Sequence, residues 1–213
     1  MATHASQPAA ADTQRTPQRK PLGERELITM MAMLMALQAF GIDAILPALD
    51  RLAVALDVPG NDRQFVIGVY LLASGIGALA PGALADRFGR RPILLTSIAL
   101  YITLSLASAM VTTFSSLIAI RALQGFFGAA IIALPPAIIR DRVGGDKMAR
   151  MMSLIFVIFL MVPAIAPSIG ELILLAFDWR AIFAAMAVQG VVIGAWVYFR
   201  LPESLAPENR QKI

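Results

Sequence analysis

The chain has 213 residues, of which 58% are hydrophobic and 15% are charged, and its formal net charge is +4. Ordinary soluble domains contain about 25% charged residues, so most of this chain is expected to lie in lipid. The sequence has no cysteine, which excludes a disulfide framework, thiol chemistry and a cysteine-ligated metal. The only histidine, His4, lies in a polar stretch. No run of residues has metal-ligand spacing or the glycine loop that cradles a nucleotide phosphate.

These absences narrow the classes of function. We expect no enzyme activity, no metal and no bound cofactor, because the usual catalytic groups are almost missing. The basic residues are confined to loops and are not interleaved with aromatic residues, which argues against nucleic acid as a partner.

Residues 1–24 are rich in Ala, Gln, Thr, Pro and basic residues and show no hydrophobic period. This composition is typical of a disordered tail. The apolar run that follows is too long for a secretory signal and has no small-residue cleavage site.

Six apolar segments then have about the 20 residues that a helix needs to cross the hydrocarbon of a bilayer. Helices are expected because a lone apolar strand would leave its backbone polar groups unsatisfied in lipid. The sequence therefore predicts an all-α membrane protein with a six-helix domain over residues 25–201, followed by a linker or tail over 202–213. The expected spans are Leu27–Leu49, Gln64–Ala85, Pro92–Val111, Phe114–Ile139, Met151–Phe177 and Ala181–Leu201.

The basic residues predict the orientation. Fourteen of the 18 Lys and Arg residues precede the first span, follow the sixth, or lie in the loops after the second and fourth spans. Three lie on the other side, and Arg121 is inside a span. Because Lys and Arg are retained on the cytoplasmic side, we expect both termini to be cytoplasmic in a bacterial inner membrane.

Three ionisable residues lie inside the predicted spans: Asp43, Arg121 and Glu171. A charge at such a position costs about 2.5–3.5 kcal/mol or more, so it indicates a function by default. At 1.5 Å per residue all three lie roughly 9–10 Å from the outer ends of their helices. Gln38 and Gln124 lie about one turn deeper. A polar cavity in the outer half of the bundle would explain this shared depth.

Two of these residues also have a simpler interpretation. Arg121 could snorkel to the interface, and Glu171 could merely end its helix. For Arg121, the nearby Gly125 and Gly128 favour a packed interior, because small residues let another helix approach closely. The same reasoning predicts helix contact along Ser74, Ala78 and Gly82, with Gly75 and Gly77 beside them.

The loop between the second and third spans carries a compact charged motif. It reads Gly-Ala-Leu-Ala-Asp-Arg-Phe-Gly-Arg-Arg over residues 82–91 and is flanked by apolar runs without charge. In this motif the chain resembles the major facilitator superfamily, within it the drug:proton antiporter branch of the bicyclomycin-resistance type. The matching residues include Gly82, Asp86, Arg87, Gly89, Arg90 and Arg91.

Further segments carry the same resemblance. The run Arg121-x-x-Gln124-Gly125 is similar to a second family signature, and Asp43 to Leu49 is similar to the branch's first helix. Residues 163–170, with Pro163, Pro167 and Gly170, resemble the antiporter signature of the fifth helix, although Ala166 and Glu171 stand where glycine is expected. The segments Arg140-Asp141 and Leu201-Pro-Glu-Ser204 also fit the branch's loops.

The resemblance implies one half-bundle of the major facilitator fold, built from 3+3 inverted repeats. It further implies proton-coupled efflux of small amphipathic compounds by alternating access, with the proton gradient as the energy source. In this view Asp43, Arg121, Gln38, Gln124 and Glu171 line the cavity or couple protons. The 82–91 motif forms a cytoplasmic latch, and the residues of helix kinks and packing are Pro47, Gly125, Pro163, Pro167 and Gly170.

Members of this family usually have twelve spans, and only six are predicted here. Three arrangements remain open: pairing with a separate second half, a symmetric dimer, or a truncated copy. The alternative function is accordingly a non-transporting membrane protein that retains the family motifs.

Overall fold

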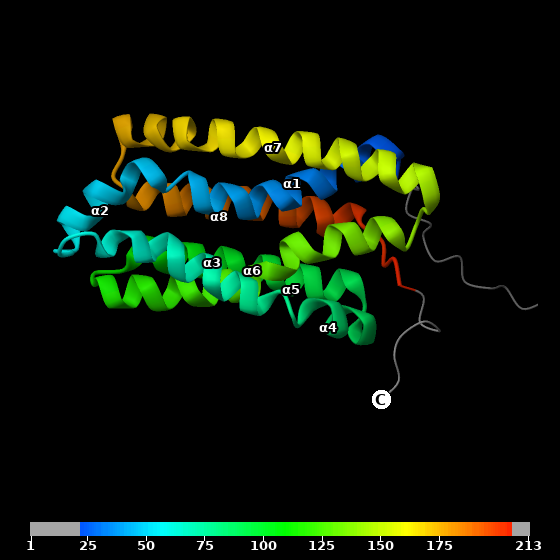
Figure 1. The fold of residues 1–213 in the computed structure, drawn as a ribbon, viewed down its shortest axis with the longest axis horizontal. Helices are drawn as coiled ribbons and strands as arrows, with labels where there is room; N and C mark the ends of the chain where they lie inside the picture. The colour runs from blue at the N-terminus through cyan, green and yellow to red at the C-terminus, as the bar shows by residue number, and fades with distance from the viewer. Residues whose placement is uncertain (1–21, 206–213) are drawn as a thin grey trace, which may run out of the picture.

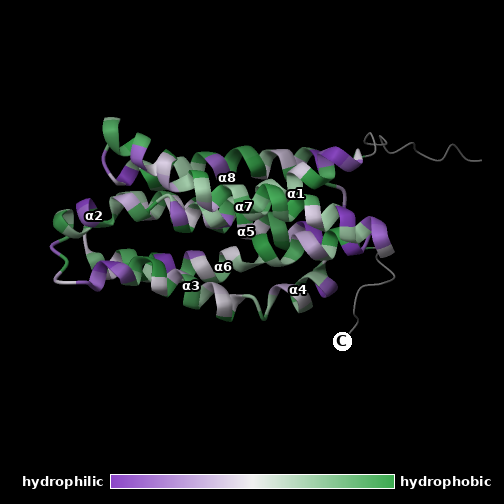
Figure 2. Cartoon of the chain, turned by 45° about the horizontal axis from the view of Figure 1, so that its top comes forward, coloured by the Kyte–Doolittle hydropathy of each residue, from purple (hydrophilic) through white to green (hydrophobic). Residues whose placement is uncertain are grey.

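A computed structural model describes residues 22–205, and these residues contain helices but no strand. The predicted tail over residues 1–21 and the linker residues 206–213 lie outside the described part. The helices run along one common direction (Figure 1), with hydrophilic residues gathered mainly toward the two ends of the bundle (Figure 2). The elements are α1 (Glu24–Asp43), α2 (Leu49–Ala55), α3 (Phe65–Gly77), α4 (Pro81–Phe88), α5 (Arg90–Met110), α6 (Phe114–Arg140), α7 (Gly145–Ala176) and α8 (Arg180–Arg200), with short 3-10 turns at Leu46–Ala48 and Asp62–Gln64.

These elements form the six predicted spans. Five helical stretches are long and apolar enough to cross a membrane, and α3 with α4 makes a sixth span that is bent by 47°. The prediction of a six-helix all-α membrane bundle is therefore confirmed in the described residues.

Prolines set the two helix breaks. Pro lacks an N–H and its ring clashes with the carbonyl of the residue four positions earlier. The residue four before Pro47 is Asp43, where α1 ends, and the residue four before Pro81 is Gly77, where α3 ends. The expected spans Leu27–Leu49 and Gln64–Ala85 are thus interrupted rather than continuous. Pro163 and Pro167, by contrast, lie inside α7 without ending it.

The helix pairing has an internal symmetry. If α1, α3/α4 and α5 are taken as one set of three spans and α6, α7 and α8 as another, the first span of each set packs against the middle span of the other. These contacts are α1 with α7 and α6 with α3, while α5 packs against α8 and α1 against α6. This exchange is the arrangement expected of two three-helix repeats.

The beginning of α1 and the end of α8 lie at the same end of the bundle (Figure 1). We call this the terminal end. It also contains the Gly89 junction between α4 and α5.

Burial differs strongly between helices: 67% of the apolar window of the first span is buried, against 11% of that of α7. The side of the bundle formed by α7 therefore carries an apolar surface that the described residues do not cover.

Candidate functional site: a buried arginine and a charged cluster

Arg121 lies seven residues after the start of α6 and is completely buried. Its guanidinium donates three hydrogen bonds to three different helices or turns of helix. Nε donates to the carbonyl of Val66 (3.2 Å), Nη2 to the carbonyl of Gly41 (2.9 Å) and Nη1 to Oε1 of Gln124 (2.8 Å). The guanidinium carbon also lies 4.0 Å from the centre of the Tyr70 ring. The side chain therefore points into the bundle, and the snorkelling interpretation does not fit.

Gln124 extends these contacts into a chain of buried polar groups. Its Nε2 donates to Oγ of Ser105 (2.7 Å), and that hydroxyl donates to the carbonyl of Tyr101 (2.8 Å). The Tyr101 hydroxyl in turn donates to the carbonyl of Leu37 (3.1 Å). We call Arg121, Gln124, Ser105 and Tyr101 the central network. It joins α6, α5, α1 and α3, and all four of its side chains are fully buried.

Glycines place the helices close enough for these bonds. A Cβ on Gly125 would overlap the carbonyl of Tyr70, and a Cβ on Gly77 would overlap the backbone of Phe126. A Cβ on Gly128 would lie 2.6 Å from Oε1 of Gln38. The close approach predicted for Gly125 and Gly128 is thus present. Of the stripe predicted on the second span, Gly77 makes such a contact, whereas Gly75 and Gly82 have open space.

Gln38 lies beside the central network rather than in it. Its side chain is buried, and Nε2 donates to Oγ of Ser74 over 3.3 Å. Its Oε1 is buried and has no hydrogen-bond partner within the described residues. The two predicted glutamines therefore make different contacts: Gln38 binds Ser74 of α3, and Gln124 binds Ser105 of α5.

Asp43 is the last residue of α1, two positions after the Gly41 carbonyl that Arg121 contacts. The residue is partly exposed, and its carboxylate has no hydrogen bond or ion pair among residues 22–205. Arg121 likewise has no carboxylate within ion-pair distance in this part of the chain. The structure thus places a partly exposed acid close in sequence to the backbone that binds a buried cation without a carboxylate partner.

Gly170 and Glu171, which were also predicted as site residues, lie near the C-terminal end of α7. Glu171 is exposed and has no ion-pair partner in the described range. Its neighbour Gly170 packs against the turn after α1, where a Cβ would overlap the carbonyl of Ala44 and approach Pro47. Gly170 and Pro47 therefore act in helix packing, and Glu171 is separate from the central network.

A second group of polar residues lies at the terminal end. Arg90 is buried, and its guanidinium forms ion pairs with Asp86 (2.8 Å) and Asp141 (3.1 Å). The junction before it needs Gly89, whose φ of +101° is disfavoured for other residues. We call Asp86, Arg90, Asp141 and Glu203 the terminal cluster. It ties the end of α4 and the start of α5 to the end of α6.

Glu203 connects the segment after α8 to the same cluster. Its carboxylate accepts hydrogen bonds from the backbone N–H groups of Arg90 (2.9 Å) and Arg91 (3.2 Å). These are unsatisfied donors at the beginning of α5, where a negative charge is also favoured by the helix dipole. Arg91 adds a hydrogen bond from Nη2 to the carbonyl of Tyr198 (2.7 Å).

The residues of the charged motif over 82–91 therefore differ in whether they contribute to the terminal cluster. Asp86, Gly89, Arg90 and Arg91 take part in the terminal cluster or support it, whereas Arg87 and Gly82 are exposed. Arg87 only covers the ring of the adjacent Phe88. The cluster's partners Asp141 and Glu203 were not named as site residues from the sequence, although both lie in segments that matched the family's loops.

A family model described as Major Facilitator Superfamily matches residues 31–213. The chain belongs to this superfamily. It is 34% identical over 183 residues to a "Bicyclomycin resistance protein homolog" of Haemophilus influenzae, an alignment that covers 86% of this chain and 46% of that protein. It is 33% identical over 190 residues to "Multidrug resistance protein MdtL" of Escherichia coli, covering 88% of this chain and 48% of the relative. The chain spans about half the length of the curated relatives it matches.

Solved structures show the same fold. The proton:xylose symporter XylE superposes with a TM-score of 0.75 at 17% identity, covering 85% of this chain and 45% of that one. The human organic anion transporter MFSD10 superposes with a TM-score of 0.67 at 21% identity, covering 88% and 50%. The bundle is thus one six-helix half of the major facilitator fold, and the chain is a multi-pass membrane protein of a transporter superfamily rather than an enzyme family.

Proposed function

We propose that this chain forms one half of a proton-coupled exporter of small amphipathic compounds in a bacterial inner membrane. The observation that carries the proposal is the buried Arg121 without a carboxylate partner in the described residues, hydrogen-bonded to the backbone two residues before a partly exposed Asp43. Relatives named for bicyclomycin resistance and multidrug resistance support export of foreign small molecules.

Asp43 is the proton carrier in this mechanism. Protonation of Asp43 removes a negative charge at the end of α1, two residues after the Gly41 carbonyl that binds Arg121. Because neither charge is otherwise neutralised, proton exchange changes how the turn after α1 is held against α6. No cofactor is required, since the proton gradient supplies the energy.

A transport cycle needs a second bundle facing this one. The apolar side chains exposed on α3 and α7, such as Leu72 (66%) and Leu160 (67%), offer a surface for it. A second six-helix half, either a separate partner or another copy of this chain, would enclose the site together with this bundle. Lipid surrounds the outer surface of the paired bundles, and the substrate binds between the two halves.

The terminal cluster is the latch of this cycle. It joins α4, α5, α6 and the segment after α8 through ion pairs and backbone caps, so it can hold the terminal end closed. We place this end, with both termini, on the cytoplasmic side because fourteen of the 18 basic residues precede the first span, follow the sixth, or lie in the loops after the second and fourth spans.

The decisive experiment is proton-driven accumulation of ethidium in inverted membrane vesicles that contain the chain. Asp43→Asn should abolish accumulation while leaving the amount of protein in the membrane unchanged. Asp50→Asn is the matched control, because Asp50 is exposed and pairs only with Arg63. Unchanged accumulation in Asp43→Asn would reject the proton role.

The alternative function, a membrane protein that retains the motifs without transporting, predicts no ethidium movement even for the wild-type chain with a second half bound. The same vesicles distinguish it. Mass measurement of the purified chain in mild detergent then reports whether a second half is bound.

A further inference from the structure

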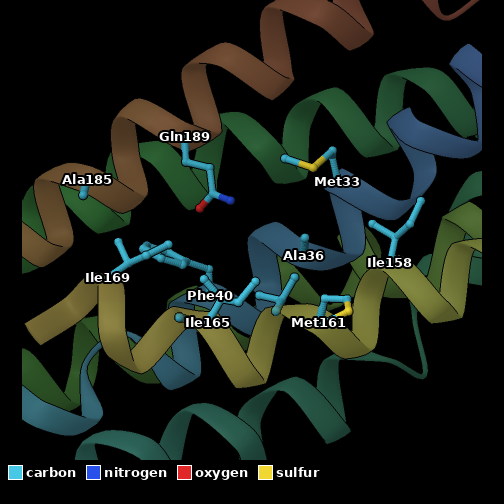
Figure 3. A pocket seen from close by; sticks show the side chains of 11 residues that line it. Met33, Ala36, Phe40, Ile158, Met161, Ile165, Ile169, Ala185 and Gln189 are labelled. Carbon is cyan, nitrogen blue, oxygen red and sulfur yellow. The ribbon is translucent and has the colours of Figure 1, made fainter. Parts of the chain in front are cut away.

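A groove lies between α7 and α8, with α1 as its floor (Figure 3). Its volume is about 430 Å³, within the range of roughly 300–1,000 Å³ that small-molecule sites occupy. The groove belongs to neither the central network nor the terminal cluster. Representative lining residues are Met33 and Phe40 of α1, Met161 and Ile165 of α7, and Ala185 and Gln189 of α8.

The lining is apolar except at one position. Gln189 is the single side chain with hydrogen-bonding groups among the lining residues, and its carboxamide points into the space between the helices (Figure 3). Met33 lies on the floor of the groove and Met161 on its α7 wall. Methionine side chains adapt their shape to different contents, so such walls suit ligands of varied outline.

The Gln189 oxygen is unsatisfied. Oε1 is buried and has no hydrogen-bond partner in the described part of the chain. A buried acceptor without a partner costs free energy, whereas a bound donor removes that cost. Rotation of the carboxamide toward the groove would let Oε1 bind an occupant that brings a polar hydrogen into this otherwise apolar space.

The depth of Gln189 in the membrane indicates which kind of molecule can pair with it in the groove. Gln189 lies nine residues from the beginning of α8, or about 14 Å at 1.5 Å per residue, and slightly further from its end. Phospholipid headgroups remain near the interfaces, and acyl chains carry no donor. An ordinary lipid would therefore fill the groove without pairing with the amide.

The rims show how a ligand could enter. Ile165, which lines the groove on α7, is 50% exposed, so this edge of the groove is apolar and uncovered. A lipophilic molecule dissolved in the bilayer meets no charged barrier there.

We propose that this groove binds an uncharged lipophilic small molecule that carries a hydroxyl, taken up laterally from the bilayer, with the hydroxyl bound to Gln189. A hydroxyl both donates and accepts, so it pairs with either end of the carboxamide. The inference goes beyond the proposed transport function, because binding here needs no proton gradient and no second bundle.

The test uses the whole chain in nanodiscs of phosphatidylethanolamine and phosphatidylglycerol. Two photoprobes are compared: decanol carrying a mid-chain diazirine, and decane carrying the same diazirine. The alcohol should label groove residues of α7 and α8 saturably, at concentrations about tenfold lower than the alkane, which is the discrimination that one hydrogen bond in a buried site gives.

Variants separate the hydroxyl contact from simple partitioning. Gln189→Leu should remove the preference for the alcohol and leave labelling at the level of the alkane. Ala185→Phe should fill the groove and suppress labelling by both probes. Val188→Leu, on the neighbouring exposed position, is the matched control and should label as the wild type does.

Three results would overturn the proposal. Equal labelling by both probes would mean that acyl chains occupy the groove. Absence of labelling in the groove would mean that it is closed or covered by protein. A preference for the alcohol that survives in Gln189→Leu would place the hydroxyl elsewhere.

Discussion

Arg121 and Arg90 are both buried, with 0% and 5% of their surface exposed, but they are neutralised differently. Arg90 has two carboxylates, Asp86 and Asp141, within 3.1 Å. Arg121 has two backbone carbonyls, an amide oxygen and an aromatic ring, and no carboxylate within ion-pair distance in the described residues.

The difference shows what each arginine can do. A cation already paired with two acids holds helix ends together and has little to gain from another charge. A buried cation without an acid is costly, and it can respond to an acid whose charge changes. The central network is therefore suited to sensing protonation, and the terminal cluster to fastening.

The largest effect is expected at Arg121. Arg121→Lys should destabilise the bundle by about 3 kcal/mol, because lysine retains a buried charge but cannot reach three acceptors on three sides. Arg121→Met should cost less, since it removes the charge along with the hydrogen bonds. The measurement is the free energy of unfolding from SDS titration in mixed micelles, followed by tryptophan fluorescence.

Arg121→Met is the control, because it removes both the positive charge and the hydrogen bonds of the guanidinium. If lysine proved milder than methionine, the charge itself would be stabilising. Arg121 would then be neutralised by an acid, and the contrast with Arg90 would disappear.

The next effect tests how the network is assembled. Gly125→Ala should destabilise the bundle by about 2 kcal/mol, because the added methyl would overlap the carbonyl of Tyr70 and force α3 away from α6. Gly75→Ala is the matched control: this residue has open space, so the change should be neutral or stabilising by up to about 1 kcal/mol.

The same SDS titrations measure both glycine variants. Equal destabilisation by the two would show that general helix propensity, not the close approach at Gly125, sets the position of Arg121.

At Arg90 the order of substitutions should reverse. Arg90→Met should cost about 1.5 kcal/mol, since it removes the guanidinium that pairs with both Asp86 and the partly buried Asp141. Arg90→Lys should cost less than 1 kcal/mol, because lysine keeps a positive charge between the two acids. The check is again the free energy of unfolding, and Arg87→Met, at an exposed position, is the control that should change it little.

The positions of the six spans and the packing around Gly125 could be predicted from the sequence. Apolar length identifies a span, and glycines next to an intramembrane arginine indicate a packed interior. Hydropathy does not mark where a helix ends, however. The α7 helix begins at Gly145, six residues before the expected Met151, because a helix can continue past the lipid with exposed Lys147 and Arg150 on it.

Partners that are distant in the sequence were harder to predict. Arg90 is 51 residues from Asp141 and 113 from Glu203, and no local pattern connects them. The small residues of the second span also misled in part, because α3 is apolar on all sides and its period does not show which face is packed. Gln189 carries no sequence signal, since its importance comes only from the groove that surrounds it.

The smallest effect should come from salt, and it separates the two arginines most directly. Raising the salt from about 0.01 M to about 1 M shortens the screening length from roughly 30 Å to 3 Å. Asp86 is 35% exposed in the terminal cluster, so the destabilisation caused by Arg90→Met should shrink by about 0.5 kcal/mol, the scale of a partly exposed ion pair. The destabilisation caused by Arg121→Met should not change, because ions do not enter the interior where its partners lie. A salt dependence at Arg121 as large as that at Arg90 would mean that water and ions reach the central network. The two arginines would then differ in their hydrogen-bonding and ion-pair partners but not in their exposure to water and ions.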